Sequence, residues 1–511
     1  MESGNLGATH ASANGDDVHD SNLLASVRPT DWSQPRPSSR YNLVVIGAGT
    51  AGLVCAAGAA ILGAKVALVE RHRLGGDCLN TGCVPSKALI RAARAAHAAI
   101  EARRFGIDAA AGRPDFGRVM ERLREVRAEI GHHDSVKRFR EFGVEIFFGP
   151  ARFDGAGSVD VAGTKLRYRK AVIATGARAV APPIAGLADA GYLTNESVFE
   201  LRSMPSRLMV IGAGPVGCEL AQAFARLGAE VTLVEVLPRP LPNEDREAAA
   251  IVTRSLEEDG VRIRLDTTIL SVETVEGGKR VHMRTRAGNE TVTVDEILVS
   301  AGRAPNVEEL GLDAVGVDHD HQRGVRVNDR MQTSNPRIYA AGDVAQRHKF
   351  THTADAAARI VLRNALFFGR KKLSALTVPW CIYTSPEIAH VGLSEHEATG
   401  RGIALDTIRI DLAEVDRSLI DGAARGFVKI HVKQGSGRIL GATIVSEQAG
   451  NLISEITLAM VHGIGLGRIS SVIHPYPTVA DAIRMAADAY NRRRLSPRIH
   501  RLLAAWFGRR R

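Results

Sequence analysis

Hydrophobic and polar positions follow the same order in two separate segments of the chain, residues 41–70 and residues 206–235. Each segment starts with an apolar run of strand length and continues through a Gly-x-Gly-x-x-Gly turn into an apolar helical stretch. A second apolar run then ends in an acidic residue, 23 positions after the first glycine in both segments. This order predicts two strand–helix–strand units of the same design.

The pattern changes after residue 370. Residues 426–447 alternate between apolar and polar positions around glycine-centred turns, which predicts an antiparallel sheet, and residues 451–465 read as an apolar helix. Residues 1–39 are rich in Ser, Asn, Asp, Gly and Pro and show little apolar pattern, so we expect a mobile arm there. The predicted fold class is α/β, with two Rossmann-like dinucleotide-binding domains and a C-terminal α+β domain.

Both glycine-rich turns have the spacing of a dinucleotide site. The first glycine makes the strand-to-helix turn, the second lets a pyrophosphate approach the backbone, and the third allows close helix–strand packing. The acid is expected to hydrogen-bond a ribose hydroxyl, so Glu235 favours NADH over NADPH, although Arg239 could compensate for its charge. The predicted binding residues are Gly47, Gly49, Gly52 and Glu70 in the first site and Gly212, Gly214, Gly217 and Glu235 in the second.

Two cysteines, Cys78 and Cys83, lie in the segment LGGDCLNTGCVPSKAL. Residues five apart in an ideal helix have Cα atoms about 8 to 9 Å apart, too far for a disulfide. A redox pair therefore requires a bend at residues 80–82 and a helix that begins near Cys83, where the thiol pKa is lowered. Lys87, one turn further, adds a positive charge. Zinc binding would need further Cys or His ligands at suitable spacing, and none are nearby.

The chain resembles the class I pyridine nucleotide–disulfide oxidoreductases, the family of dihydrolipoamide dehydrogenase, glutathione reductase and mercuric reductase. Besides the two fingerprints and the CxxxxC pair, four further signatures recur in the family's order over residues ~40 to ~490. They are ATGA (174–177), SAGRAPN (300–306), IYAAGDV (338–344) and YTSPEIAHVG (383–392).

This resemblance implies a domain order and two cofactors, FAD and NAD(P)H. It places Thr175, Gly176, Asp343 and Lys87 at the FAD site and Gly302 at the NAD(P) site. The expected domains are an arm (1–39), an FAD-binding part (40–190), an NAD(P)-binding domain (191–305), a second FAD-binding part (306–375), a dimerisation domain (376–490) and a basic tail (491–511).

The resemblance also implies a route for electrons from NADH through FAD to a Cys78–Cys83 disulfide. Cys83 is the expected flavin-facing thiolate and Cys78 the exposed interchange thiol. Glu219 is expected to pair with Lys87, the alternative being a surface glutamate. Cys55, Cys218 and Cys381 have no partner nearby in sequence and are expected in the core.

The segment IHPYPTVAD departs from the family's disulfide reductases, which carry an acid–base histidine before Pro-Thr, contributed by the other subunit. Tyr476 occupies that place, Asp481 follows where a glutamate orients the histidine, and His474 matches a histidine without that role. A phenol with a pKa of about 10 is a poor base at neutral pH. His352 is expected either near the redox centre or as a simple helix-start residue.

Mercuric reductases also carry tyrosine in this place, and a metal ion taken up by two thiolates needs no proton for a departing sulfur. They end in a cysteine pair that hands over the metal, whereas no cysteine follows Cys381 here. Another soft metal, a quinone or another small oxidant therefore stays open as acceptor.

Composition excludes some other classes. Five cysteines in 511 residues do not make a disulfide framework, and no apolar run approaches the ~20 residues that span a bilayer. The start of the chain lacks the pattern of a signal peptide, so we expect a cytoplasmic protein. Much of the net charge of +10 lies in residues 491–511, which hold eight arginines and no acid. We favour a solvated or subunit-docking helix there over a membrane or nucleic-acid patch.

The predicted protein is a homodimeric FAD enzyme that uses NAD(P)H, with NADH favoured, and a Cys78–Cys83 redox disulfide. Its acceptor is expected to be a metal ion or another small molecule, as in mercuric reductase. The alternatives are a dihydrolipoamide dehydrogenase and a low-turnover redox sensor or interaction flavoprotein. We expect no resident metal, no nucleic acid and no membrane span.

Overall fold

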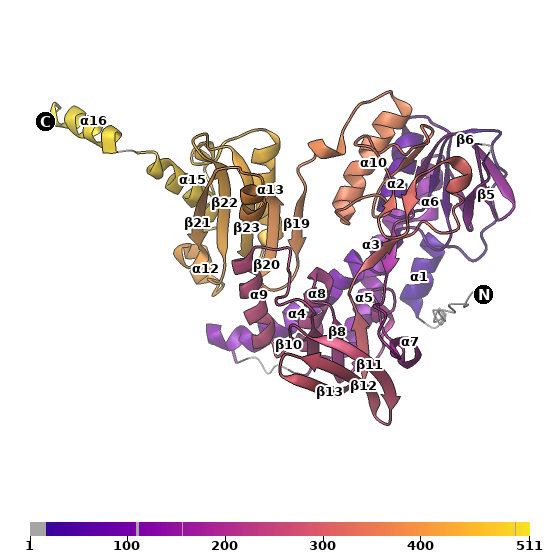
Figure 1. Cartoon of the computed structure of the whole chain (residues 1–511), viewed down its shortest axis with the longest axis horizontal. Helices are drawn as coiled ribbons and strands as arrows, with labels where there is room; N and C mark the ends of the chain where they lie inside the picture. The colour runs from indigo at the N-terminus through magenta and orange to yellow at the C-terminus, as the bar shows by residue number, and fades with distance from the viewer. Residues whose placement is uncertain (1–16, 109–111, 156, 496, 511) are drawn as a thin grey trace.

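The computed structural model describes residues 17–108, 112–155, 157–495 and 497–510. Two α/β units, each built on a parallel sheet, are followed by a third unit with an antiparallel sheet (Figure 1). The mixed architecture confirms the predicted fold class. Within the described residues, no helix is both long and apolar enough to cross a membrane.

The first unit holds the first glycine-rich turn at the carboxyl end of its central strand. β1 pairs in parallel with β2 and with β6, and β18 returns from far along the chain to pair with β6. The strands are apolar and buried because helices cover the sheet. Its strands are β1 (Tyr41–Ile46), β2 (Val66–Glu70), β3 (Val144–Phe148), β4 (Ala151–Phe153), β5 (Ser158–Val161), β6 (Thr164–Ile173) and β18 (Ile338–Ala340). Its helices include α2 (Thr50–Ile61), α3 (Gly76–Asn80), α4 (Cys83–Glu101), α5 (Phe116–Gly131), α6 (Val136–Glu141) and α10 (Thr351–Leu366).

A helix precedes the first strand where we expected a mobile arm. α1 (Val18–Val27) buries Leu23 and Val27 in the core of the first unit. Asp20 forms an ion pair of 2.7 Å with Arg127, a guanidinium with 1% side-chain exposure. The prediction is therefore wrong for this helix, because the partners that hold it lie about a hundred residues away in sequence. Residues 1–16 of the expected arm lie outside the described residues.

The second unit repeats the first on a smaller scale. β8 pairs in parallel with β9 and β14, and the second glycine-rich turn joins β8 to α8. A three-stranded antiparallel sheet is attached to it. Its elements are β8 (Arg207–Ile211), α8 (Pro215–Arg226), β9 (Glu230–Val234), α9 (Arg246–Glu258), β10 (Arg262–Arg264), β11 (Thr268–Val275), β12 (Gly278–Thr285), β13 (Gly288–Val294) and β14 (Glu296–Val299). β7 (Ala177–Ala179) and β15 (Arg303–Pro305) pair where the chain enters and leaves this unit.

The third unit is a five-stranded antiparallel sheet, as the alternating pattern predicted, with α13 and α15 packed against it. A last helix, α16, follows α15 and projects away from the body (Figure 1). The elements are β19 (Pro379–Ile382), β20 (Glu387–Gly392), α11 (Glu395–Gly400), β21 (Leu405–Asp411), α12 (Asp416–Ile420), β22 (Phe427–Lys433), β23 (Ile439–Ser446), α13 (Ala449–Val461), α14 (Leu466–Ile469), α15 (Asp481–Arg493) and α16 (Pro497–Gly508).

One core joins the units around the cysteine pair. Leu89 and Ala93 of α4 share a hydrophobic cluster with Leu220 and Phe224 of α8 and with Ile382 of β19. Packing of α4 against α8 therefore positions the helix that begins at Cys83 beside the helix of the second glycine-rich turn.

Candidate functional site

The first glycine-rich turn is shaped by contacts that only glycine permits. Gly47 has φ of 101°, and a Cβ on Gly52 would lie 1.8 Å from the carbonyl oxygen of Gly47. Gly49 begins the approach to α2, and a Cβ there would lie 3.7 Å from the Cα of Gly76. The turn therefore offers backbone and no side chain to a phosphate, as a dinucleotide site requires.

The acid at the end of β2 is held beside this turn. Glu70 accepts hydrogen bonds from the N–H groups of Ala48 and His72, each at 2.7 Å. A carboxylate has acceptor capacity beyond these two bonds, so Glu70 can also accept from a ribose hydroxyl. The glycine cradle and this carboxylate fit the adenosine and pyrophosphate parts of FAD.

The second turn repeats the arrangement. Gly212 also has φ of 101°, and Glu235 accepts from the N–H groups of Ala213 at 2.8 Å and Leu237 at 3.0 Å. A Cβ on Gly214 would meet nothing within 4 Å, so this turn is open on the side where a pyrophosphate would approach. A Cβ on Gly217 would lie 1.9 Å from the Gly212 carbonyl oxygen. The residues fit a second dinucleotide.

Arg239, the residue that could have offset the charge of Glu235, is engaged elsewhere. Its guanidinium donates to the carbonyl oxygens of Leu241 at 3.4 Å and Glu244 at 3.2 Å, and to that of Pro242. Arg239 therefore does not neutralise the charge of Glu235.

Hydrogen bonds join the ATGA and SAGRAPN segments. The side chain of Asn306 donates to the Thr175 carbonyl at 2.9 Å, and its backbone N–H donates to the Gly176 carbonyl at 3.0 Å. Gly302 opens the second return, with φ of 158°. The ATGA and SAGRAPN segments therefore lie side by side where the chain returns to the first unit.

Asp343 follows β18 and lies in a buried, charged setting. Burial raises the pKa of its carboxyl, which lies 3.8 Å from the Arg303 Nε atom. Arg303 also forms an ion pair with Asp77 in α3. Its own Nε is buried without a hydrogen-bond partner, a polar atom that a bound cofactor could satisfy.

The segment between the two cysteines is bent as the sequence required. α3 ends at Asn80, and α4 begins at Cys83 after Gly82, whose φ and ψ are −133° and −110°. A Cβ on Gly82 would lie 2.8 Å from the Asp77 carbonyl oxygen, so glycine permits the close return of the chain. Both cysteines are free thiols, Cys78 half-buried and Cys83 exposed.

The two thiols differ in acidity. A hydrogen bond from Cys78 lowers the pKa of Cys83, and the Thr351 hydroxyl and the positive charge of Lys87 act in the same direction. Sharing that hydrogen bond raises the pKa of Cys78, and burial raises it further. Cys83 Sγ lies 3.2 Å from Thr351 Oγ1. These effects favour Cys83 over Cys78 as the thiolate of the pair.

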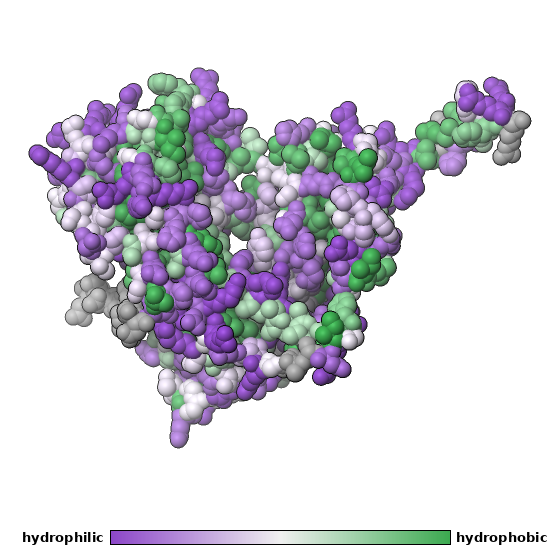
Figure 2. Space-filling model, turned by 180° about the vertical axis from the view of Figure 1, so that it is seen from behind, coloured by the Kyte–Doolittle hydropathy of each residue, from purple (hydrophilic) through white to green (hydrophobic). Residues whose placement is uncertain are grey.

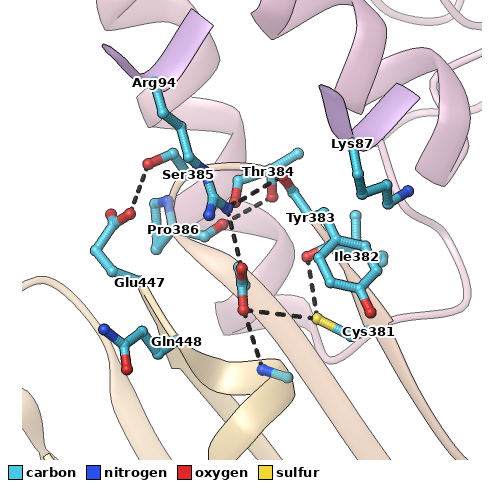
Figure 3. A network of polar contacts seen from close by, with 12 residues as sticks. Lys87, Arg94, Cys381, Ile382, Tyr383, Thr384, Ser385, Pro386, Glu447 and Gln448 are labelled. Atoms are coloured by element: carbon cyan, nitrogen blue, oxygen red, sulfur yellow. Dashed lines mark hydrogen bonds and ion pairs between the residues drawn. The ribbon is translucent and has the colours of Figure 1, made fainter. Parts of the chain in front are cut away.

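A charged pair stands next to Cys83. Lys87 Nζ lies 2.8 Å from Glu219 Oε2, and the other oxygen of Glu219 accepts from the Tyr383 N–H at 2.9 Å. The ammonium group also lies 4.5 Å from the centre of the Tyr383 ring. Figure 3 shows the Lys87 and Tyr383 side chains. The ion pair expected from the resemblance is present, and Glu219 is buried rather than on the surface.

A second network on the same helix ties α4 to the third unit (Figure 3). Arg94 donates to the Thr384 carbonyl and to Glu387, both at 3.0 Å, and Glu387 accepts from the Gly450 N–H at 3.0 Å. The thiol of Cys381 lies 3.8 Å from Glu387 and is half-buried, whereas Cys55 and Cys218 are in the core as expected. The turn between β19 and β20 is thereby fixed to the helix of the redox pair.

Tyr476 and Asp481 lie apart from this cluster within the chain. The Tyr476 hydroxyl donates to Asp416 at 2.9 Å, and this bond raises the pKa of the phenol. Asp481 is bound instead by Arg484, with Nε 2.7 Å from the carboxylate. Tyr476 is 74% exposed on the surface of the third unit.

The two histidines considered from the sequence have structural partners. His474 lies 3.0 Å from Glu455. His352 lies at the start of α10, and its Nε2 atom lies 2.7 Å from the Pro379 carbonyl oxygen. In the described ranges, no three His, Cys, Asp or Glu side chains are grouped so as to hold a metal ion.

Thr351 and Tyr383 were not expected at the site from the sequence. They lie more than 260 residues after the cysteine and lysine that they contact, and no local spacing joins them. A signal did exist for each, because Thr351 opens the helix that follows the IYAAGDV segment and Tyr383 opens the YTSPEIAHVG segment.

With this site in place, comparison with known proteins assigns the chain to a family. Residues 41–358 match the pyridine nucleotide-disulphide oxidoreductases, and residues 378–487 match the dimerisation domain of the same family. The chain belongs to the pyridine nucleotide–disulfide oxidoreductases, enzymes that use FAD and NAD(P)H.

Individual relatives differ in what they act on. The chain is 34% identical to a mercuric reductase of Lysinibacillus sphaericus over 452 residues, 88% of this chain and 83% of that protein. It is 37% identical to a dihydrolipoyl dehydrogenase of Thermus scotoductus over 466 residues, 88% of this chain and 98% of that protein. The Cu(II) complex of the HOCl-induced flavoprotein disulfide reductase RclA from Escherichia coli has a TM-score of 0.78 at 26% identity, covering 87% of this chain and 98% of that one.

Proposed function

We propose that this enzyme uses NADH to reduce a thiophilic metal ion held by Cys78 and Cys83. The observation that carries the proposal is an intact dithiol, with Cys83 as the favoured thiolate, in a chain whose acid–base position holds Tyr476. A thiolate pair binds a soft ion directly, and no departing sulfur has to be protonated. The overall reaction with a divalent ion such as Hg(II) is balanced: NADH gives a hydride, the ion takes two electrons, and NAD⁺ and a proton are released.

The residues have separate tasks in this scheme. FAD, when bound, would supply the two-electron relay between the nicotinamide and the metal ion that the dithiol holds. Gly47, Gly49, Gly52, Glu70, Thr175, Gly176 and Asp343 would hold it, and Gly212, Gly214, Gly217, Glu235 and Gly302 would hold NADH. Lys87, paired with Glu219, keeps a positive charge beside Cys83 and so stabilises its thiolate.

The metal-ion assignment rests on what Tyr476 can do. A phenol whose pKa is raised by Asp416 stays protonated, so it donates a hydrogen bond but does not accept a proton at neutral pH. Disulfide substrates need a proton for the leaving thiolate, while a metal ion does not. The relatives named mercuric reductase and the copper complex of RclA support the same class of acceptor.

We also propose that the enzyme is a cytoplasmic homodimer. The dimerisation-domain match supports the homodimer, as do the exposed apolar side chains of Leu458, Val461, Val472 and Ile473 on the third unit. A dithiol that works through its reduced form suits the reducing cytoplasm, where NADH is supplied.

A panel of acceptors tests the proposal. Purified enzyme is mixed with NADH or NADPH and with Hg(II), Cu(II), lipoamide or a benzoquinone, and nicotinamide oxidation is followed by absorbance. We expect NADH oxidation with a metal ion to exceed that with lipoamide, and to be lost in Cys83→Ser. Faster turnover with lipoamide would replace this proposal by the second candidate. No turnover with any acceptor would favour a redox sensor.

The second candidate is a dihydrolipoyl dehydrogenase, supported by the relative that matches over 98% of its own length. Tyr476→His separates the two. If the residue stands at an acid–base position, this change should raise lipoamide reduction by about 10²-fold and leave metal-ion reduction nearly unchanged. An unchanged lipoamide rate would show that Tyr476 does not face the substrate.

A further inference from the structure

The last helix of the chain, α16, has no part in the redox site. It follows α15 after a short connection and points away from the third unit (Figure 1). Every residue from 501 to 510 is exposed. Packing against the rest of this chain therefore does not explain why the helix is apolar on one side.

The apolar side of α16 is continuous. Leu502 and Trp506 are four residues apart, as are Leu503 and Phe507, so all four side chains lie on one face of the helix. Their exposed fractions are 71%, 40%, 52% and 59% for residues 502, 503, 506 and 507. Figure 2 shows hydrophobic side chains along this helix and hydrophilic ones toward its end.

The segment that carries this apolar face is rich in positive charge. Residues 491–511 contain eight arginines and no acid, with three arginines before the helix and three after it. The guanidinium of Arg510 lies 4.3 Å from the centre of the Trp506 ring, so the charged and aromatic groups meet at one end of the face. A helix with Leu, Trp and Phe on one face and arginines around it has the composition of an interfacial membrane helix.

We propose that α16 binds the surface of a membrane rich in anionic lipids. The face of Leu502, Leu503, Trp506 and Phe507 enters the boundary between headgroups and acyl chains, and the arginines contact the lipid phosphates. Charge complementarity selects this occupant, because eight arginines without an acid within residues 491–511 match a polyanionic plane.

A second copy of the chain is the main rival occupant. The dimerisation domain already exposes other apolar side chains, Leu458 and Val461 of α13 and Val472 and Ile473 of the loop between α14 and α15. A lone helix of 12 residues offers too little area to add a stable protein interface of its own, whereas a bilayer needs no matching groove. The helix and these side chains therefore serve different partners.

Flotation of the FAD-loaded enzyme with lipid vesicles tests the proposal. We expect the vesicle-bound fraction to be about tenfold higher on phosphatidylcholine mixed with phosphatidylglycerol than on phosphatidylcholine alone, and to fall as salt is added. Trp506 emission should shift to shorter wavelength on binding. Equal binding to both vesicle types, or none to either, would overturn the proposal.

Two variants with the same added charge separate insertion from simple attraction. Leu502→Asp places the charge on the apolar face and should abolish binding, while Ala504→Asp places it on the opposite, exposed side and should retain most of it. Both should keep the wild-type flavin content and NADH oxidation. Equal binding by the two variants would contradict an inserted face.

A chain ending at residue 495 tests the rival occupants. We expect the shortened chain to sediment as a dimer, like the full chain, and not to bind vesicles. A change from dimer to monomer would assign α16 to the second copy. Retention of duplex DNA by the full chain and by Leu502→Asp alike, without vesicle binding, would assign it to nucleic acid.

Discussion

The two glycine-rich turns are closed by the same backbone contact but by different residues. In the first, the Gly75 N–H donates to the Ala48 carbonyl at 2.9 Å; in the second, the Leu241 N–H donates to the Ala213 carbonyl at 2.9 Å. Both closing residues have positive φ, 91° for Gly75 and 49° for Leu241. The Leu241 side chain is buried at 1% exposure.

The two turns differ in the residue that follows the closing hydrogen bond. Gly76 comes next in the first turn, where a Cβ would lie 2.5 Å from the Gly49 Cα, and α3 then carries Cys78 past the phosphate-binding backbone. In the second turn the chain leads into α9 and no thiol follows. The fingerprint thus defines a dinucleotide site, and the segment that crosses it decides whether redox chemistry is added.

Removing the thiolate should have the largest effect, because only the first region carries it. We expect Cys83→Ser to lower NADH oxidation by about a thousandfold or more with every acceptor while both dinucleotides still bind. Steady-state rates and the visible flavin absorbance per chain measure this. Cys55→Ser is the matched control, since a hydroxyl can replace its bond to the Ala358 carbonyl. Equal losses in both variants would contradict a special role of Cys83.

Alanine at the second glycine of each turn should separate the two sites. Gly214→Ala is expected to raise KM for NADH about tenfold, because the methyl occupies the open approach to the backbone, with flavin content unchanged. Gly49→Ala should instead lower flavin content. The two readouts are flavin per chain and KM at saturating acceptor. Loss of flavin in Gly214→Ala would show that the turns are not independent.

The acid of the second turn should set nucleotide preference. Glu235→Ser removes the carboxylate and is expected to shift the ratio of kcat/KM for NADPH over NADH by about tenfold toward NADPH. Glu230→Gln, at the other end of β9 and paired with Arg262, is the control and should leave the ratio unchanged. An unaltered ratio in Glu235→Ser would mean that Glu235 does not contact the ribose.

The smallest effect concerns the acidity of Cys83. Its pKa is lowered, so the reactive thiolate persists at pH values below those of an ordinary cysteine. Iodoacetamide labelling of Cys83 should therefore stay fast at pH values below the pKa of an ordinary cysteine thiol. Lys87→Gln should raise the pH midpoint of labelling and slow labelling severalfold at neutral pH. Mass spectrometry of peptides from the labelled Cys78→Ser variant would show whether Cys83 is the reactive thiol. A labelling midpoint at the pKa of an ordinary cysteine in the wild type would contradict the lowered pKa of Cys83.

The sequence predicted the features that depend on spacing. Two fingerprints, the acids 23 positions after the first glycine of each, and a bend before Cys83 all follow from local backbone geometry. The contact of Lys87 with Glu219 came from family resemblance, since 132 residues separate the two. Gly82 was expected to permit the bend, and the close approach of the Asp77 carbonyl explains why.

Contacts across long stretches of sequence could not be predicted in this way. Asp20 finds Arg127, and Cys83 finds Thr351, only after the first unit has assembled. Charged residues in a polar N-terminal segment resemble a solvated arm until their partners are known. The placement of Tyr476 beside Asp416, rather than Asp481, depends in the same way on how the third unit packs.

The buried guanidinium of Arg127 has a practical consequence for shortened versions of the enzyme. It donates to Asp20, to Glu200 at 2.8 Å and to the Asn80 carbonyl at 3.1 Å, just where α3 ends. A protein that begins at the first strand would lose Asp20 and leave this buried cation with Glu200 as its remaining carboxylate, at a cost below the roughly 3 to 5 kcal/mol of a fully unpaired buried charge. Because Arg127 also binds the Asn80 carbonyl, such trimming should disturb the bend between Cys78 and Cys83, so the N-terminal helix helps to set the geometry of the redox pair.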